Sequence, residues 1–169
     1  QAHHVQAQLQ QHHPNLSIEL IPRTTPGDQK TDCALGDVGG KTLFVKNIQR
    51  TVLEGHADIA VHALKDMAVD PHPDLTVVAF LKRGDARDAW VSPKHASLAE
   101  LPQGACIGTG SPRRQCQIHA CRPDLRCMLL RGNVQSRLQK IEDPDTPMAG
   151  SILAAAGLQR LGLEDHIRS

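Results

Sequence analysis

The predicted fold depends first on the stretch Asp58-Ile59-Ala60-Val61-His62-Ala63-Leu64-Lys65-Asp66. Its apolar residues alternate up to Ala63, with the period of two that is typical of a buried strand. The run stops at two adjacent opposite charges, Lys65 and Asp66. Because ligands bind outside the carboxyl ends of strands in open α/β sheets, this charged pair is a candidate site. The alternative is a solvated turn between a strand and a loop.

Two later stretches favour the site. Residues 108–117 read Gly-Thr-Gly-Ser-Pro-Arg-Arg-Gln-Cys-Gln, and residues 130–138 read Leu-Arg-Gly-Asn-Val-Gln-Ser-Arg-Leu. Ser is a preferred helix N-cap and Pro a preferred first residue, so a helix that begins after Ser111 has Arg113 and Arg114 in its first turn. Cations there oppose the helix dipole by about 0.3–1 kcal/mol unless an anion lies between them. The pattern predicts an anion-binding site; the alternative is a solvent-facing basic surface.

Strand and helix patterns alternate along the chain, which predicts an α/β fold with two lobes, residues 1–82 and 83–169. In the first lobe we expect helices over 2–13 and 41–54, the latter with Gly55 as C-cap, and strands over 17–22, 58–63 and 75–81. In the second lobe we expect strands over 89–92, 105–109, 126–130 and 151–155, and helical segments over 97–101, 111 onward, 133–141 and 157–161.

Charge and composition exclude several classes of protein. Residues 1–82 carry seven Lys/Arg against nine Asp/Glu, whereas residues 83–169 carry twelve against nine. Six arginines but only one acid, Asp124, lie between Arg113 and Arg137, with no aromatic residue for base stacking, so small polyanions fit better than nucleic acid. No apolar run approaches the ~20 residues of a membrane span. With five cysteines and no signal peptide at the start, we expect reduced thiols and a cytoplasmic protein.

Histidines near the start of the chain raise the question of a metal site. They fall in pairs at opposite ends of the first expected helix: His3 and His4, His12 and His13. Ligands to one ion have to converge, so we expect a solvated face and no bound metal.

The motifs resemble those of the porphobilinogen deaminase (hydroxymethylbilane synthase) family. They match that family in order and spacing: Val38-Gly39-Gly40-Lys41-x-Leu43-Phe44-Val45-Lys46, Val61-His62-x-x-Lys65-Asp66, the runs at 108–117 and 130–138, and Ala156-Gly157-Leu158-x-Arg160-Leu161-Gly162. The resemblance implies two lobes similar to those of type II periplasmic binding proteins, with the active-site cleft between them. It also implies a monomeric transferase that joins four porphobilinogen molecules head to tail, with loss of ammonia, to give hydroxymethylbilane for porphyrin and haem synthesis.

The resemblance also assigns roles to individual residues. Asp66 matches the catalytic aspartate, which would stabilise a cationic pyrrole intermediate and assist proton transfer. Arg131 and Arg137 would bind substrate carboxylates, since arginine pairs carboxylates bidentately. The residues implied to bind the dipyrromethane cofactor are Lys65, Thr109, Ser111, Arg113, Arg114 and Gly132.

The chain also departs from the family pattern. The unusual residues are Pro26, Asp37, Gly110 and Pro112. We expect an internal fragment that lacks the family's opening strand and its third domain, whose cysteine holds the cofactor covalently, and that is inactive by itself. The alternatives are a non-enzymatic anion-binding module of the periplasmic-binding type and an inactive paralogue.

Overall fold

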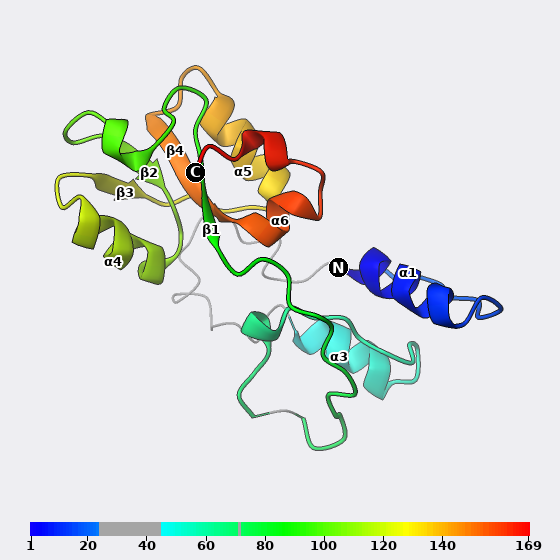
Figure 1. Ribbon diagram of the computed structural model, residues 1–169. Coiled ribbons are helices and arrows are strands. Elements are labelled where there is room, and N and C mark those ends of the chain that lie inside the picture. Colours follow the sequence, from blue (N-terminus) through cyan, green and yellow to red (C-terminus); the bar gives the residue numbers. More distant parts are fainter. Residues whose placement is uncertain (24–44, 71) are drawn as a thin grey trace. The chain divides into compact units, whose positions relative to one another are not determined.

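The computed structural model describes residues 1–23, 45–70 and 72–169. The chain divides into two compact units, Gln1–Phe80 (unit 1) and Leu81–Ser169 (unit 2), and each is described by itself (Figure 1).

Unit 2 is built on a four-stranded mixed sheet. Its strands are β1 (Asp88–Val91), β2 (Cys106–Gly108), β3 (Arg126–Met128) and β4 (Met148–Ala154), in the spatial order β1-β4-β2-β3. The middle strand β2 runs parallel to both β3 and β4, whereas β1 pairs antiparallel with β4. The strands predicted for the second half of the chain are all present, with ends that differ by a few residues, and the α/β class is confirmed.

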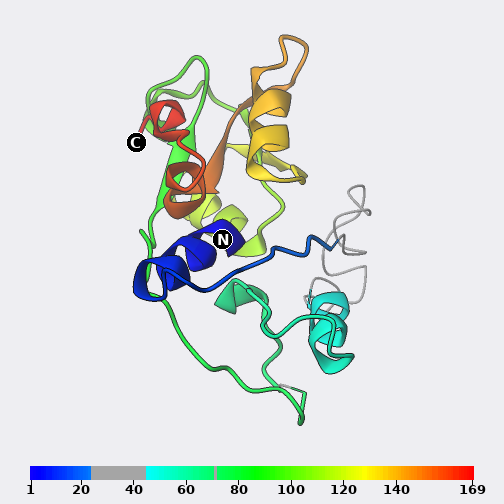
Figure 2. The same cartoon turned by 90° about the vertical axis from the view of Figure 1, so that its right-hand side faces the viewer.

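Helices follow each parallel strand of unit 2. The α-helices are α4 (Pro112–Cys121), α5 (Val134–Glu142) and α6 (Ala155–Gln159), and the short 3-10 helices are η4 (Leu98–Glu100) and η5 (Glu164–His166). The predicted caps are confirmed: Ser111 caps α4 with Pro112 as its first residue, and Asn133 caps α5. Near the end of the chain, η5 packs against α6 (Figure 2).

Two apolar clusters hold the helices on opposite faces of this sheet. One cluster joins α4 to the face that carries Trp90 and Ile107; its members are Trp90, Leu101, Ile107, Ile118 and Leu125. The other joins α5 and α6 to the opposite face; its members are Ala89, Val91, Leu138, Leu153, Ala155 and Leu158. Successive residues of β1 thus point to different clusters, as the alternation of a strand requires. A sheet covered on both faces by helices results (Figure 1).

Unit 1 is helical in its described part. It contains α1 (Ala2–His12), α3 (Lys46–Leu53) and the 3-10 helix η3 (Leu64–Asp66). Gly55, just after α3, has φ of 72°, the left-handed conformation that the predicted C-cap needs. The helix predicted over 41–54 is observed from Lys46; residues 41–44 lie outside the described residues.

The strands predicted in unit 1 are wrong. Residues 17–22, 58–63 and 75–81 form no strand in the structure. Ala63 has the extended backbone angles of a strand. A strand also requires hydrogen bonds to a neighbouring strand, however. No such neighbour occurs among the described residues of unit 1. Several of their apolar side chains stay in solvent: Ile59 is 52% exposed and Phe80 is 71% exposed.

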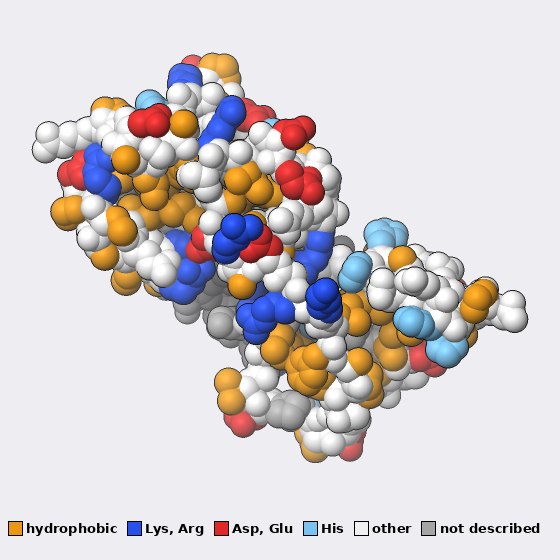
Figure 3. Space-filling view, viewed as in Figure 1, with side chains coloured by type: hydrophobic (Ala, Val, Ile, Leu, Met, Phe, Trp, Pro, Cys, Tyr) orange, Lys and Arg blue, Asp and Glu red, His pale blue; other side chains and the backbone are white. Residues whose placement is uncertain are grey.

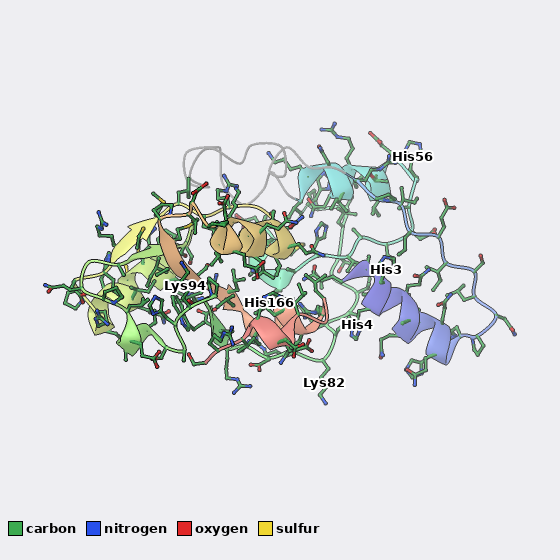
Figure 4. All side chains as sticks on the ribbon, turned by 90° about the horizontal axis from the view of Figure 1, so that it is seen from above. His3, His4, His56, Lys82, Lys94 and His166 are labelled. Carbon is green, nitrogen blue, oxygen red and sulfur yellow. The ribbon has the colours of Figure 1, made fainter. Side chains whose placement is uncertain are left out.

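The histidines of α1 lie on its solvated surface, as predicted. His3, His4, His12 and His13 are all exposed, and Figure 4 shows the first two on α1 and His56 just beyond α3. Across the described segments, no helix has both the length and the apolar composition needed to cross a membrane.

Candidate functional site

The carboxyl ends of three strands meet at one edge of the sheet in unit 2. Because β2, β3 and β4 are parallel, the loops that follow Gly108, Met128 and Ala154 leave from the same side. Strand β1 runs the other way, and its first residue, Asp88, is paired with Ala154. We call this region the carboxyl edge: residues 109–114 after β2, residues 129–137 after β3, and Asp88. It is the position where open α/β sheets bind ligands.

The loop after β2 is held by short-range hydrogen bonds. The buried Thr109 donates its N–H to the carbonyl of Met128 at 2.8 Å, which ties this loop to the end of β3. Its hydroxyl accepts the N–H of Ser111 at 3.2 Å. Ser111 in turn caps α4 by accepting the N–H of Arg114 at 3.5 Å. These bonds place Arg113 and Arg114 in the first turn of α4, as predicted.

The loop after β3 depends on a glycine. Gly132 has φ of 118°, a conformation that side chains rarely adopt, and a Cβ atom there would collide with the Ser136 hydroxyl. The next residue, Asn133, accepts the N–H of Ser136 at 2.8 Å and starts α5. Arg137 then donates from Nε back to the carbonyl of Gly132 at 2.8 Å. The loop and the helix therefore fix the side chain of Arg137 at the carboxyl edge.

Gly110 and Pro112, two departures from the family pattern, fit the geometry. A Cβ atom at Gly110 would lie 3.3 Å from the carbonyl oxygen of Leu130, so the loops after β2 and β3 approach closely at this point. Pro112 occupies the first position of α4, where its fixed φ suits the helix and its missing N–H is not needed. The other two departures, Pro26 and Asp37, lie outside the described residues.

Asp88 provides the counter-charge of the two adjacent arginines. One of its carboxylate oxygens accepts from Nη2 of Arg114 at 2.7 Å, and the other accepts from Nη2 of Arg113 at 2.9 Å. Partial burial raises the pKa of Asp88, but the hydrogen bonds and charges of Arg114 and Arg113 outweigh this effect, and the net pKa lies below its ordinary value. Asp88 is therefore ionised at neutral pH.

Sequence reasoning missed Asp88. It precedes the arginines by 25 and 26 residues and belongs to no motif at 108–117 or 130–138. The signal that could have found it is the imbalance of charge, because a run of arginines in first-turn positions needs an acid from elsewhere in the chain. The antiparallel pairing of β1 with β4 places Asp88 at the carboxyl edge, beside these arginines.

The carboxyl edge keeps an excess of positive charge. Burial lowers the pKa of Arg137, and the neighbouring charges of Arg114 and Arg131 lower it further. These guanidinium groups therefore lie close enough to repel one another. Arg131 is only 8% exposed, and its backbone carbonyl accepts from Nζ of Lys140 at 3.3 Å. A gathering of guanidinium groups that repel one another is an environment that favours a bound anion.

Lys65 and Asp66 lie in unit 1, on η3, and are described apart from the carboxyl edge. The N–H of Asp66 donates to the carbonyl of Ala63 at 2.9 Å, which closes the 3-10 turn. Among the described residues, no ion pair joins Lys65 to Asp66. His62 is the titratable neighbour of this turn: burial lowers its pKa, and the charge of Asp66 opposes that shift only in part. His62 is thus neutral at pH 7.

The family model for the porphobilinogen deaminase dipyromethane cofactor binding domain matches residues 1–169. The chain belongs to the porphobilinogen deaminase family. This membership confirms the resemblance inferred from the motifs and indicates a general role in tetrapyrrole biosynthesis, in a family of transferases. The mixed sheet with helices on both faces agrees with the periplasmic-binding-protein-like fold of this domain family.

The structure brings seven of the predicted site residues together at the carboxyl edge. They are Thr109, Ser111, Arg113, Arg114, Arg131, Gly132 and Arg137. It places Lys65 and Asp66 on one turn of unit 1. No group of three or more His, Cys, Asp or Glu side chains in the described parts of the chain is arranged to hold a metal ion.

Proposed function

We propose that this chain takes part in joining four porphobilinogen molecules head to tail, with loss of ammonia, to give hydroxymethylbilane. In this proposal the carboxyl edge binds the acetate and propionate carboxylates of the dipyrromethane cofactor and of the pyrrole substrate. The observation that carries it is that the loops after β2 and β3 bring four arginines to one edge of the sheet, where their charges repel one another and Asp88 is the described counter-charge. A polyanionic ligand relieves that repulsion.

The residues at the carboxyl edge fit the dipyrromethane. Guanidinium groups pair carboxylates through two parallel hydrogen bonds and stay charged at any physiological pH. Nε of Arg114 is buried and has no hydrogen-bond partner within the described segments, so Asp88 does not satisfy every donor of this pair of arginines. When bound, the dipyrromethane supplies the primer on which pyrrole units are joined.

The predicted binding residues then divide into two roles. Arg113 binds a cofactor carboxylate directly, and Arg114 supports that site with its charge while it stays paired with Asp88. Arg131 and Arg137 bind substrate carboxylates. Thr109, Ser111 and Gly132 act by shaping the loops: Thr109 is buried and bonded within its own loop, Ser111 caps α4, and Gly132 permits the turn before α5. The chain binds these anions with backbone and side chains that are already in place before the ligand arrives.

Asp66 performs the catalytic role in this proposal. Its carboxylate stabilises the positive charge that develops on a pyrrole when ammonia leaves, and it assists transfer of the pyrrole proton. The neutral His62 beside it adds no competing cation. Lys65, exposed on the same turn, binds a cofactor carboxylate.

The broader features expected from the sequence belong to the same proposal. They are two lobes over residues 1–82 and 83–169, a covalently held cofactor, a cytoplasmic location, a monomer, and no nucleic-acid or membrane partner. Each follows from the family resemblance or from the composition, which has balanced charge and an odd number of cysteines.

Calorimetry tests the binding part of the proposal. The 169-residue chain should bind a dipyrromethane that carries acetate and propionate groups, more weakly at high salt than at low salt. Replacing one arginine by glutamine, Arg131→Gln or Arg137→Gln, should remove about 1.5–3 kcal/mol, or roughly 10- to 100-fold in affinity. Arg126→Gln is the matched control, because exposed Arg126 begins β3 at the opposite edge, where it donates to the carbonyl of Gly104 at 3.0 Å.

Equal effects of the control and the edge variants would overturn the binding site. The catalytic part needs a protein that contains this chain and turns over porphobilinogen. There, Asp66→Asn should lower kcat by ~10²–10³ while the dipyrromethane still binds, by comparison with lost charge stabilisation elsewhere. Near-normal turnover would remove Asp66 from the mechanism. Binding with no turnover in any form of the protein would favour the anion-binding module instead.

A further inference from the structure

The carboxylate of Asp88 already binds two arginines of the carboxyl edge. Each of its oxygens accepts from a different guanidinium, Arg113 at 2.9 Å and Arg114 at 2.7 Å. An acetate or propionate group of a ligand presents the same two oxygens. The protein therefore carries, within its own chain, a competitor for the groups that it is proposed to bind.

The two ion pairs of Asp88 differ in how easily they break. The side chain of Arg114 is 12% exposed, whereas that of Arg113 is 59% exposed. Removing the carboxylate from Arg114 would leave a largely buried charge without its counter-ion, which is strongly unfavourable. The pair with Arg113 is open to water, and such exposed pairs contribute little to stability.

Arg113 also keeps a second partner when it loses Asp88. Its Nη1 donates to the side-chain oxygen of Gln117, one turn further along α4, at 2.8 Å. This bond holds the guanidinium near the carboxyl edge while Nη2 changes partner. Asp88, for its part, remains satisfied by Arg114, so the exchange leaves no group of the pair stranded.

We propose that Asp88 is a positioning residue that sets the ligand affinity of the carboxyl edge: it stays with Arg114 and releases Arg113 to the incoming carboxylate. The inference rests on the proposed function, because it assumes that carboxylated ligands bind at this edge. Its consequence is selectivity. A ligand with several carboxylates gains enough binding free energy from the other arginines to displace Asp88 from Arg113. A ligand with a single carboxylate does not.

The test is the affinity of Asp88→Asn in the 169-residue chain for the acetate- and propionate-bearing dipyrromethane, measured at low salt. Removing the competitor should tighten binding by ~2- to 5-fold. Asp85→Asn is the matched control: it makes the same change of charge three residues away, on an aspartate that pairs with Arg87, and should leave the affinity unchanged. Adding Arg113→Gln to Asp88→Asn should abolish the gain.

Unchanged or weaker binding by Asp88→Asn would overturn the inference. The proposed function is judged separately, by binding to the unaltered chain and its loss in Arg137→Gln. A measurement on the unaltered chain covers the case in which Asp88→Asn does not fold. The guanidinium NMR signal of Arg113 should shift when the dipyrromethane is added, while that of Arg114 should not. A shift of both signals, or of neither, would overturn the inference.

Discussion

Unit 2 buries its apolar side chains on both faces of a sheet, whereas unit 1 leaves many of its own in solvent. The interior of unit 2 contains Ile107 and Leu158 with no exposed surface at all. In unit 1, Phe80 is 71% exposed and Val78 is 78% exposed, and hydrophobic side chains are visible on its surface in Figure 3. Both units have similar apolar patterns in sequence. The difference shows that an alternating pattern supplies a face for burial but not the partner that covers it.

The two units also differ in how they use charge. Unit 2 joins aspartates to arginines, at Asp85 with Arg87, Asp88 with two arginines, and Asp124 with Arg122. It also has one histidine pair, His166 with Glu142. The described ion pairs of unit 1 involve histidine and a carboxylate, at His56 with Glu54 and His72 with Asp74, and both are exposed. Guanidinium pairs keep their charge at every physiological pH, but histidine pairs do not. The guanidinium–carboxylate pairs found among the described residues thus all lie in unit 2.

The largest difference between the units should appear in amide hydrogen exchange. Residues 148–154 form the ladder of β4, whereas residues 75–81 donate no ladder hydrogen bonds. Exchange from a core strand follows the global free energy of unfolding, and exchange from an unpaired segment has almost no barrier. Mass spectrometry of peptides should show protection of 148–154 that is ~10³-fold or more above that of 75–81. Equal protection would mean that 75–81 is a paired strand after all.

Truncating a buried side chain in unit 2 should lower the free energy of unfolding by a few kcal/mol more than the same truncation in unit 1. Ile107→Ala removes a fully buried side chain from the central strand β2 and should lower the free energy of unfolding by about 2–5 kcal/mol. Ile59→Ala, at a site that is 52% exposed in unit 1, should change it by less than about 0.5 kcal/mol. Urea denaturation followed by far-ultraviolet circular dichroism measures both variants, and the fluorescence of Trp90, the one tryptophan of the sequence, reports on the core of unit 2.

The two isoleucines form a matched pair, because the same atoms are removed in different surroundings. A loss for Ile59→Ala as large as that for Ile107→Ala would show that Ile59 is buried in solution, and the contrast between the units would fail.

The smallest effect concerns the titration of His62. Its pKa should lie below the ordinary 6.5, because burial disfavours the imidazolium more than Asp66 favours it. The unfolded chain then binds the proton more readily, so stability is lost as the pH falls from 6.5 toward the folded-state pKa and is regained above 6.5. NMR titration of the imidazole measures this directly. Asp66→Asn should lower the pKa further, because it removes the opposing charge.

Asp74→Asn is a control for that titration, since Asp74 pairs with His72 instead. A pKa of His62 at or above 6.5, or one that rises in Asp66→Asn, would show that His62 and Asp66 are not arranged as described.

Local chemistry was predictable from sequence in both units. Ser111 followed by Pro112 predicted the start of α4, Asn133 the start of α5, and Gly55 the end of α3. Each of these signals works within a few residues of chain: a side chain accepts a nearby N–H, a ring fixes φ, or a missing Cβ permits a left-handed turn. The residues that gather at the carboxyl edge were predictable for the same reason, because they belong to short motifs next to these caps.

Asp88 shows where such reasoning ends. Nothing within a few residues of Arg113 or Arg114 marks Asp88 as their partner, because the contact depends on the antiparallel pairing of β1 with β4. The mutual repulsion of Arg114, Arg131 and Arg137 likewise depends on two loops that leave the sheet side by side. Charges far apart in sequence affect one another only after folding has set their distance.

The sequence by itself determined the family, the caps and the residue types of the candidate site, since all of these are carried by neighbouring residues in the chain. Only the tertiary structure decided which alternating segments became strands. Residues 89–91 pair with β4 and are covered by helices on both faces of the sheet. Residues 59–63 have no pairing partner among the described residues. The physical reason is that a strand is completed by hydrogen bonds and burial supplied by other parts of the chain, whereas a helix cap is completed within its own turn.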